Sequence, residues 1–135
     1  MKKYWDEDAE PNAGDSQQDF PVIRYSDVLL TYAEAQAELG NFNVANEYLN
    51  MVKSRANLPD VDINNIEDFK DEVLLERRKE FVAEGQRFFD LVRTETLEEE
   101  VQEAKGIQVN PIYYLFPIPQ RERDVNTNLP QNPGY

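Results

Sequence analysis

Cysteine and histidine are both missing from this chain of 135 residues. Without cysteine there is no disulfide, no thiolate metal site and no cysteine nucleophile. Without histidine the chain lacks the commonest general base, the usual zinc ligand and the Ser-His-Asp triad. These absences remove the most common forms of covalent and metal-assisted catalysis. We therefore expect neither a cofactor nor a bound metal.

Basic residues are also scarce. Fourteen lysines and arginines face 27 aspartates and glutamates, which gives a formal net charge of -13. Nucleic-acid surfaces need clustered basic side chains, so this balance argues against a nucleic-acid partner. No run of eighteen apolar residues is present, and the first residues, MKKYWDEDAEP, lack the apolar stretch of a signal peptide. We expect either a cytoplasmic protein or a piece of a longer one.

The remaining composition fits a globular protein. An apolar fraction of 40% in 135 residues is enough for one domain with a core, so we expect a single domain over residues 1–135. Residues 1–20 are acidic and contain proline and glycine, which predicts an irregular arm. Alternating carboxylates there raise the question of calcium, but Pro11 stands where an EF-hand loop needs glycine.

The segment 21–59 predicts a helical hairpin. A first helix over Ser26–Leu39 ends at Gly40, and a short turn leads into a second helix that ends before Pro59. Small residues at Ala33 and Ala45 would let the two helices approach closely. This order is typical of a tetratricopeptide unit of about 34 residues, and such a unit needs neighbours to bury its face.

Further helices are expected after the hairpin. The spacing of apolar residues predicts a long helix over 64–94 that packs on the hairpin, with a capping box at Asn64 and Glu67. Gly85 lies inside it and predicts a close backbone contact or a kink, because interior glycine costs about 1 kcal/mol. A short helix over 96–106 and an extended coil over 107–135 follow. The predicted fold is therefore all-α.

Charge and apolar residues are densest in Leu75–Thr94. Arg77 falls within the apolar stripe, so we expect it to be buried with a carboxylate partner, for which we name Glu34 from the first helix. A catalytic pair drawn from Glu76, Glu80 and Glu84 is the alternative. A glycosidase needs carboxylates on opposite sides of a cleft, whereas these share one helix face with arginines. We therefore expect no enzyme.

Three ordered motifs carry a family resemblance. They are RYSDVLL at 24–30 followed by YAEA at 32–35, ERRKEF at 76–81 followed by EGQRFFDL at 84–91, and FPIP at 116–119 followed by QNPGY at 131–135. Together they resemble the C-terminal portion of the SusD/RagB family of nutrient-binding lipoproteins. The residues that we assign to the structural family motif are Glu34, Glu76, Arg77, Glu80, Glu84, Gly85, Arg87, Asp90 and Arg93.

The resemblance implies non-catalytic capture of an oligosaccharide or similar nutrient at the outer membrane. It also implies a SusC-like TonB-dependent transporter as partner and a lipid anchor that this chain does not contain. Members of the family are several times longer, so we expect a truncated product or an excised part. The resemblance places no ligand contact within the motifs. The alternative function is an autonomous tetratricopeptide-like adaptor that binds a peptide.

Overall fold

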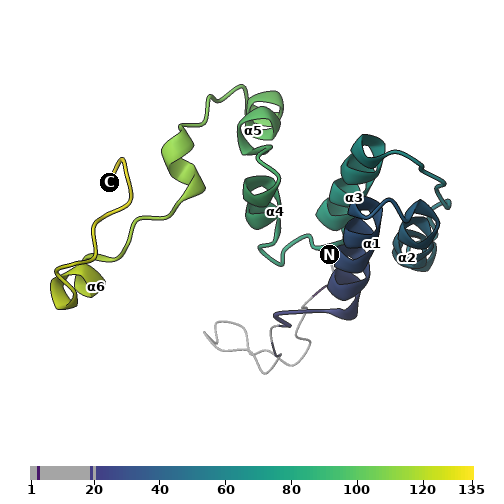
Figure 1. Ribbon diagram of the computed structural model, residues 1–135, viewed down its shortest axis with the longest axis horizontal. Helices are drawn as coiled ribbons and strands as arrows, with labels where there is room; N and C mark the ends of the chain where they lie inside the picture. The colour runs from purple at the N-terminus through teal and green to yellow at the C-terminus, as the bar shows by residue number, and fades with distance from the viewer. Residues whose placement is uncertain (1–2, 4–18, 20) are drawn as a thin grey trace, which may run out of the picture. The chain divides into compact units, whose positions relative to one another are not determined.

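The computed structural model describes Lys3, Asp19 and residues 21–135. Within this part of the chain the regular elements are helices, and none is a strand (Figure 1). They are α1 (Tyr25–Glu38), α2 (Phe42–Arg55), α3 (Ile66–Glu80), α4 (Arg87–Arg93), α5 (Leu97–Lys105), the 3-10 helix η1 (Pro111–Tyr114) and α6 (Gln120–Val125). The predicted all-α fold is confirmed.

The structure consists of two compact units, residues 1–80 and residues 81–135. Unit 1 contains α1, α2 and α3, and unit 2 contains the remaining helices and the C-terminal coil. Each unit is described by itself below. A single domain over residues 1–135 stays a prediction. The predicted arm over residues 1–20 lies outside the described residues except for Lys3 and Asp19. The calcium site that we considered in this arm, and argued against, lies there too.

In unit 1, α1 and α2 form the predicted hairpin. Gly40 adopts a positive φ of 77°, and its N–H donates to the carbonyl of Ala37 at 2.9 Å, which closes the end of α1. Ala33 and Ala45 are completely buried. Their missing side-chain volume allows the two helices to pack closely, as the tetratricopeptide-like spacing predicts.

The third helix completes the core of unit 1, because α1 packs against both α2 and α3. Leu30, Leu49, Phe69 and Val73 have no exposed surface. The linker between α2 and α3 is held by two asparagines of α2. Asn46 donates to the carbonyl of Ile63 and accepts from its N–H, and Asn50 makes the same two bonds with Val61. These bonds satisfy backbone groups in a segment that has no regular structure of its own.

The start of α3 differs from the prediction by one residue. Asn65, not Asn64, accepts the N–H of Asp68 at 2.9 Å, and its amide also donates to the carboxylate of Asp68. Asparagine is a strong capping residue at either position, so the sequence does not choose between the two neighbours.

The predicted continuous helix over 64–94 is wrong. Helix α3 ends at Glu80, a turn follows, and α4 begins at Arg87. Ala83 and Gly85 adopt positive φ angles of 68° and 75°, which a right-handed helix does not allow. A Cβ built on Gly85 would meet no atom within 4 Å, so the expected close contact is absent. Glycine at position 85 allows the positive φ angle that the turn requires.

In unit 2, α4 and α5 are joined by an ion pair and a small core. Arg87 Nη2 lies 2.6 Å from Glu100 Oε2, and Leu91 and Leu97 are buried. The rings of Phe88 and Phe116 lie 5.2 Å apart, so the segment after η1 also contacts α4.

The C-terminal coil is held by side-chain hydrogen bonds. Gln131 bonds both the N–H and the carbonyl of Ile118, Asn132 donates to the carbonyl of Phe116, and the Tyr135 hydroxyl donates to the carbonyl of Leu115. The prediction that residues 107–135 lack helix is wrong. Asn110 caps η1 and Pro111 occupies its first turn, whereas α6 begins directly after Pro119.

The turn between α3 and α4 supplies a stability prediction. Gly85→Ala places a Cβ in the left-handed region and should destabilise the chain by about 1 kcal/mol. Ala83→Gly is the matched control, because the native φ there is already positive and the substitution relieves the same steric conflict. Urea unfolding followed by circular dichroism measures both. Equal destabilisation by the two variants would contradict this assignment.

Candidate functional site

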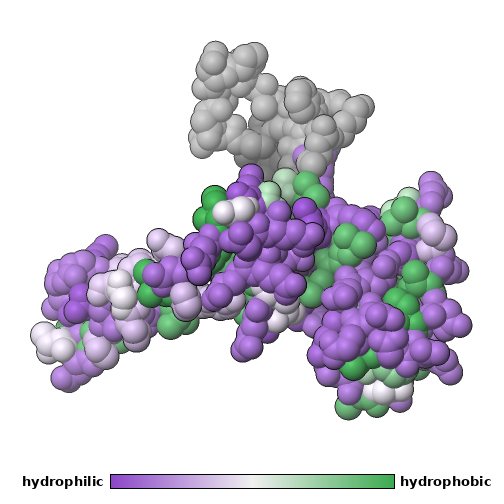
Figure 2. All heavy atoms as spheres, turned by 90° about the horizontal axis from the view of Figure 1, so that it is seen from above, coloured by the Kyte–Doolittle hydropathy of each residue, from purple (hydrophilic) through white to green (hydrophobic). Residues whose placement is uncertain are grey.

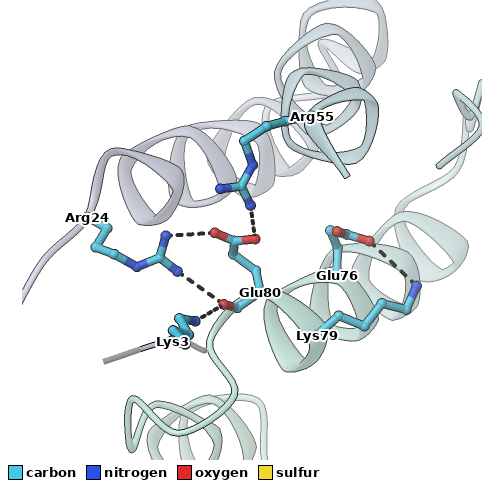
Figure 3. A network of polar contacts seen from close by, with 6 residues as sticks. All are labelled: Lys3, Arg24, Arg55, Glu76, Lys79 and Glu80. Carbon is cyan, nitrogen blue, oxygen red and sulfur yellow. Dashed lines mark hydrogen bonds and ion pairs between the residues drawn. The ribbon is translucent and has the colours of Figure 1, made fainter. Parts of the chain in front are cut away.

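A cluster of charged groups at the C-terminal end of α3 joins all three helices of unit 1 (Figure 3). Arg24 Nη1 lies 2.7 Å from Glu80 Oε1, and Arg55 contacts the other oxygen of the same carboxylate. Arg24 Nη2 and Lys3 Nζ donate to the backbone carbonyl of Glu80 at 3.1 and 2.6 Å. Arg24 precedes α1 and Arg55 ends α2, so Glu80 connects both ends of the hairpin to α3.

A second arginine of α3 is buried in the same unit. Arg77 is 6% exposed, and its Nη1 lies 2.7 Å from Asp27 Oδ1 of α1 and 3.5 Å from the hydroxyl of Thr31. The predicted burial of Arg77 beside a carboxylate is confirmed. Asp27, the carboxylate that contacts Arg77, lies on the predicted first helix, two turns before Glu34. A contact between Glu34 and Arg77 stays a prediction.

Two lysines add further links to α3. Lys53, buried on α2, pairs with Glu72. Lys70 pairs with Glu38 of α1 at 2.8 Å, and this hydrogen bond raises the pKa of Lys70 above its ordinary value of 10.5. Because the folded-state pKa is raised, the pair stabilises the fold at neutral pH and loses its effect as the pH rises above 10.5. Both side chains are exposed, so the effect is small.

Glu76 is the most buried carboxylate of the cluster. It is 1% exposed, its Oε2 has no hydrogen-bond partner, and Lys79 Nζ lies 3.5 Å away. Glu76 and Glu80 lie on successive turns of α3, and Glu84 follows in the turn after it. Glu80 is held by two arginines. Glu76 and Glu80 therefore do not form an acid and a base that face each other across a cleft.

A hollow of about 250 Å³ lies beside the charged cluster. Its floor is apolar, and two arginines of the cluster belong to its wall. The residues that line it are Arg24, Tyr25, Ser26, Leu29, Met51, Val52 and Arg55. The Ser26 hydroxyl is buried and has no hydrogen-bond partner.

The rest of the structural family motif lies in unit 2. Asp90 is 3% exposed and accepts from Arg93 at 3.0 Å, and Thr94 donates to the carbonyl of Asp90. Glu84 is also buried, and Gly85 forms the turn. These contacts lie within α4 and its flanks, so they fix local structure.

In Lys3, Asp19 and 21–135, histidine, cysteine and carboxylate side chains form no group of three that could hold a metal ion. No helix in the same part of the chain is long and apolar enough to cross a membrane.

The sequence profile of the SusD family matches residues 1–135, which is the entire chain. The chain belongs to the SusD family. SusD-like protein P38 from Formosa agariphila is 33% identical over 144 residues, a match that covers 100% of this chain and 28% of P38. SusD-like protein P2 from the same organism is 30% identical over 139 residues, covering 92% of this chain and 27% of P2.

Solved structures of the family share this fold. A SusD superfamily protein from Parabacteroides distasonis is 32% identical with a TM-score of 0.78, covering 100% of this chain and 31% of that protein. Surface glycan-binding protein A from Bacteroides thetaiotaomicron is 32% identical with a TM-score of 0.70, covering 88% of this chain and 26% of that protein. This SusD-family chain therefore spans less than a third of the length of the relatives described here.

Sequence reasoning placed Arg77 correctly in the buried stripe of α3 but missed the contacts made by Arg24, Asp27 and Arg55. A signal for Asp27 was present. It lies on the first helix seven residues before Glu34, so both carboxylates project from nearly the same side of that helix. Arg24 and Arg55 lie at opposite ends of the hairpin sequence, and only the folded hairpin brings them to one carboxylate.

The Arg77–Asp27 pair gives the second prediction. Arg77→Ala should destabilise the chain by about 2–3 kcal/mol, because it leaves Asp27 without its buried partner. Arg78→Ala, at the exposed neighbouring position, should cost less than about 1 kcal/mol. Urea unfolding of both variants and of an Asp27→Ala double-mutant cycle measures the coupling. A coupling near zero would show that the pair contributes nothing to stability.

Proposed function

We propose that this chain is the C-terminal portion of a surface glycan-binding protein that captures an oligosaccharide without catalysis. The observation that carries the proposal is the match of the SusD family to every residue of the chain. The similarity to surface glycan-binding protein A from Bacteroides thetaiotaomicron supports a glycan as the ligand class.

The arrangement of carboxylates supports binding without chemistry. Glycoside hydrolysis uses two carboxyl groups that face the scissile bond from opposite sides. In unit 1 the buried carboxylates of α3 instead lie beside basic groups, and those of Glu80 come from the two ends of the hairpin. Glu80 is paired with Arg24 and Arg55, and Glu76 lies beside Lys79. A carboxylate that is paired across helices in this way stabilises the fold.

We place the whole protein at the outer surface of the cell, held by a lipid anchor and working with a SusC-like TonB-dependent transporter. Membership of the SusD family supports this partner and this location. The proposal allows ligand contacts from parts of the family's polypeptide that these 135 residues do not match. An autonomous peptide adaptor is less well supported, because it gives no role to the hydrogen-bonded FPIP and QNPGY segments of unit 2.

Native affinity electrophoresis tests the proposed function. The chain is run through gels that contain one soluble polysaccharide each, beside a non-binding protein of similar charge. We expect retardation by one class of glycan and no release of reducing ends from any of them.

Two results would contradict the proposal. Turnover of a glycan that is abolished by Glu80→Gln would make the protein an enzyme. Retardation by none of the glycans, together with saturable binding of a helical peptide to the α1–α2 hairpin, would favour the adaptor.

A further inference from the structure

The hollow beside the charged cluster lies between the start of α1 and the end of α2. Arg24, the cap residue of α1, and the first helical residues form one wall, and Met51, Val52 and Arg55 of α2 form the other. Its volume is about 250 Å³. Pockets for drug-sized ligands measure roughly 300–1,000 Å³, so this hollow suits one small unit, such as a single sugar ring.

Both charged residues that line the hollow are arginines. Figure 3 shows their guanidinium groups converging on the carboxylate of Glu80. The side chain of Arg55 is 60% exposed and that of Glu80 is 7% exposed, so the hollow presents positive charge to the solvent. Arg55 contacts Glu80 through Nη2, which is one part of a planar fork with five N–H donors. A second carboxylate can therefore bind to Arg55, since guanidinium forks pair with planar carboxylates.

The floor of the hollow is apolar and suits the face of a sugar ring. Leu29 and Val52 are buried, Met51 is 46% exposed, and the ring of Tyr25 is 71% exposed. Figure 2 shows hydrophilic side chains over most of the face in view, with apolar side chains in smaller groups between them. Sugar rings have apolar C–H faces and polar edges, and aromatic and aliphatic side chains pack against such faces. An inorganic anion would make no use of this floor.

The Ser26 hydroxyl adds a polar group to the lining of the hollow. It is buried and has no hydrogen-bond partner within the described part of the chain, although buried hydroxyls are normally paired. A serine hydroxyl rotates between staggered positions and both donates and accepts, so it can bond a sugar hydroxyl in the hollow. An arginine, an apolar floor and an unpaired hydroxyl together match a ligand with a carboxylate, a ring and hydroxyl groups.

We propose that the hollow binds one uronic acid unit of a glycan. Its carboxylate pairs with Arg55, its ring covers the apolar floor, and one of its hydroxyls bonds to Ser26. The choice of a sugar as the carrier of the carboxylate rests on the proposed function. The formal charge of -13 repels polyanions, whereas screening at physiological salt limits this repulsion to about 8 Å. The hollow therefore selects an isolated acidic unit of an otherwise neutral glycan over a chain of acidic units.

Titration of the isotope-labelled chain, followed by NMR, tests this site. The probe is methyl β-D-glucuronide. Methyl β-D-glucoside, which has the same ring without the carboxylate, is the matched control ligand. We expect the glucuronide to cause saturable shifts of the amide signals of Tyr25, Ser26 and Arg55. The glucoside should bind at least about tenfold more weakly, because it lacks the charged partner of Arg55.

Two variants and one control locate the ligand. Arg55→Gln should weaken glucuronide binding by at least about tenfold, because it removes the charged fork. Ser26→Ala should weaken binding by about threefold or more and should not lower the midpoint of urea unfolding, because the hydroxyl has no partner to lose. Arg121→Gln, which removes an exposed arginine of α6, should leave the affinity unchanged. Since Arg55 also pairs with Glu80, the Ser26→Ala result decides if Arg55→Gln does not fold.

The proposal is overturned if the glucuronide causes no saturable shift at the hollow, if the glucoside binds as tightly, or if Arg121→Gln weakens binding as much as Arg55→Gln. Tighter binding of acetyl-leucine, which carries a carboxylate without a sugar ring, would overturn it in favour of a peptide C-terminus. Failure here leaves glycan capture standing if the electrophoresis gels still show retardation by a polysaccharide. Glycan capture fails alone if the glucuronide binds at the hollow and no polysaccharide retards the chain.

Discussion

Unit 1 depends on the carboxylate of Glu80, which is the point where its three helices meet. The side chain of Glu80 is 7% exposed, so an unpaired charge there would be expensive. Arg24 and Arg55 each take one oxygen, and the carbonyl of the same residue receives two further donors. The end of α3 is thereby fixed to both ends of the hairpin. Apolar packing supplies most of the stability, but non-directional contacts alone leave the axial position of α3 open. The shared carboxylate specifies that position.

The order of elements in unit 1 was predictable, because it rests on local signals. Gly40 ends α1, small residues mark the close approach of the hairpin, and the stripe through Phe69 and Val73 is buried as its spacing indicates. The burial of Arg77 was predictable for the same reason. Its contact with Asp27 was not predictable, because α1 carries three carboxylates, at Asp27, Glu34 and Glu38, and helix spacing does not choose among them.

The break after Glu80 shows the limit of periodicity. Apolar residues continue through Phe81, Phe88 and Leu91 at spacings that suit one helix, and the sequence contains no proline there. The evidence for a turn was Gly85, whose cost in a helix led us to expect only a close backbone contact or a kink. The positive φ of Ala83 could not be foreseen, since alanine favours helix and adopts the left-handed region only where its surroundings impose it. In unit 2, η1 and α6 are too short to show a period.

Charged residues have different roles within the folded units and at the surface of this protein. Carboxylates of the same chain pair with five of its basic side chains, which are Arg24, Lys53, Arg55, Arg77 and Arg87. The chain as a whole carries 13 more negative than positive charges, so its surface is not basic. A surface of this kind repels anionic partners and offers little electrostatic attraction to another acidic protein.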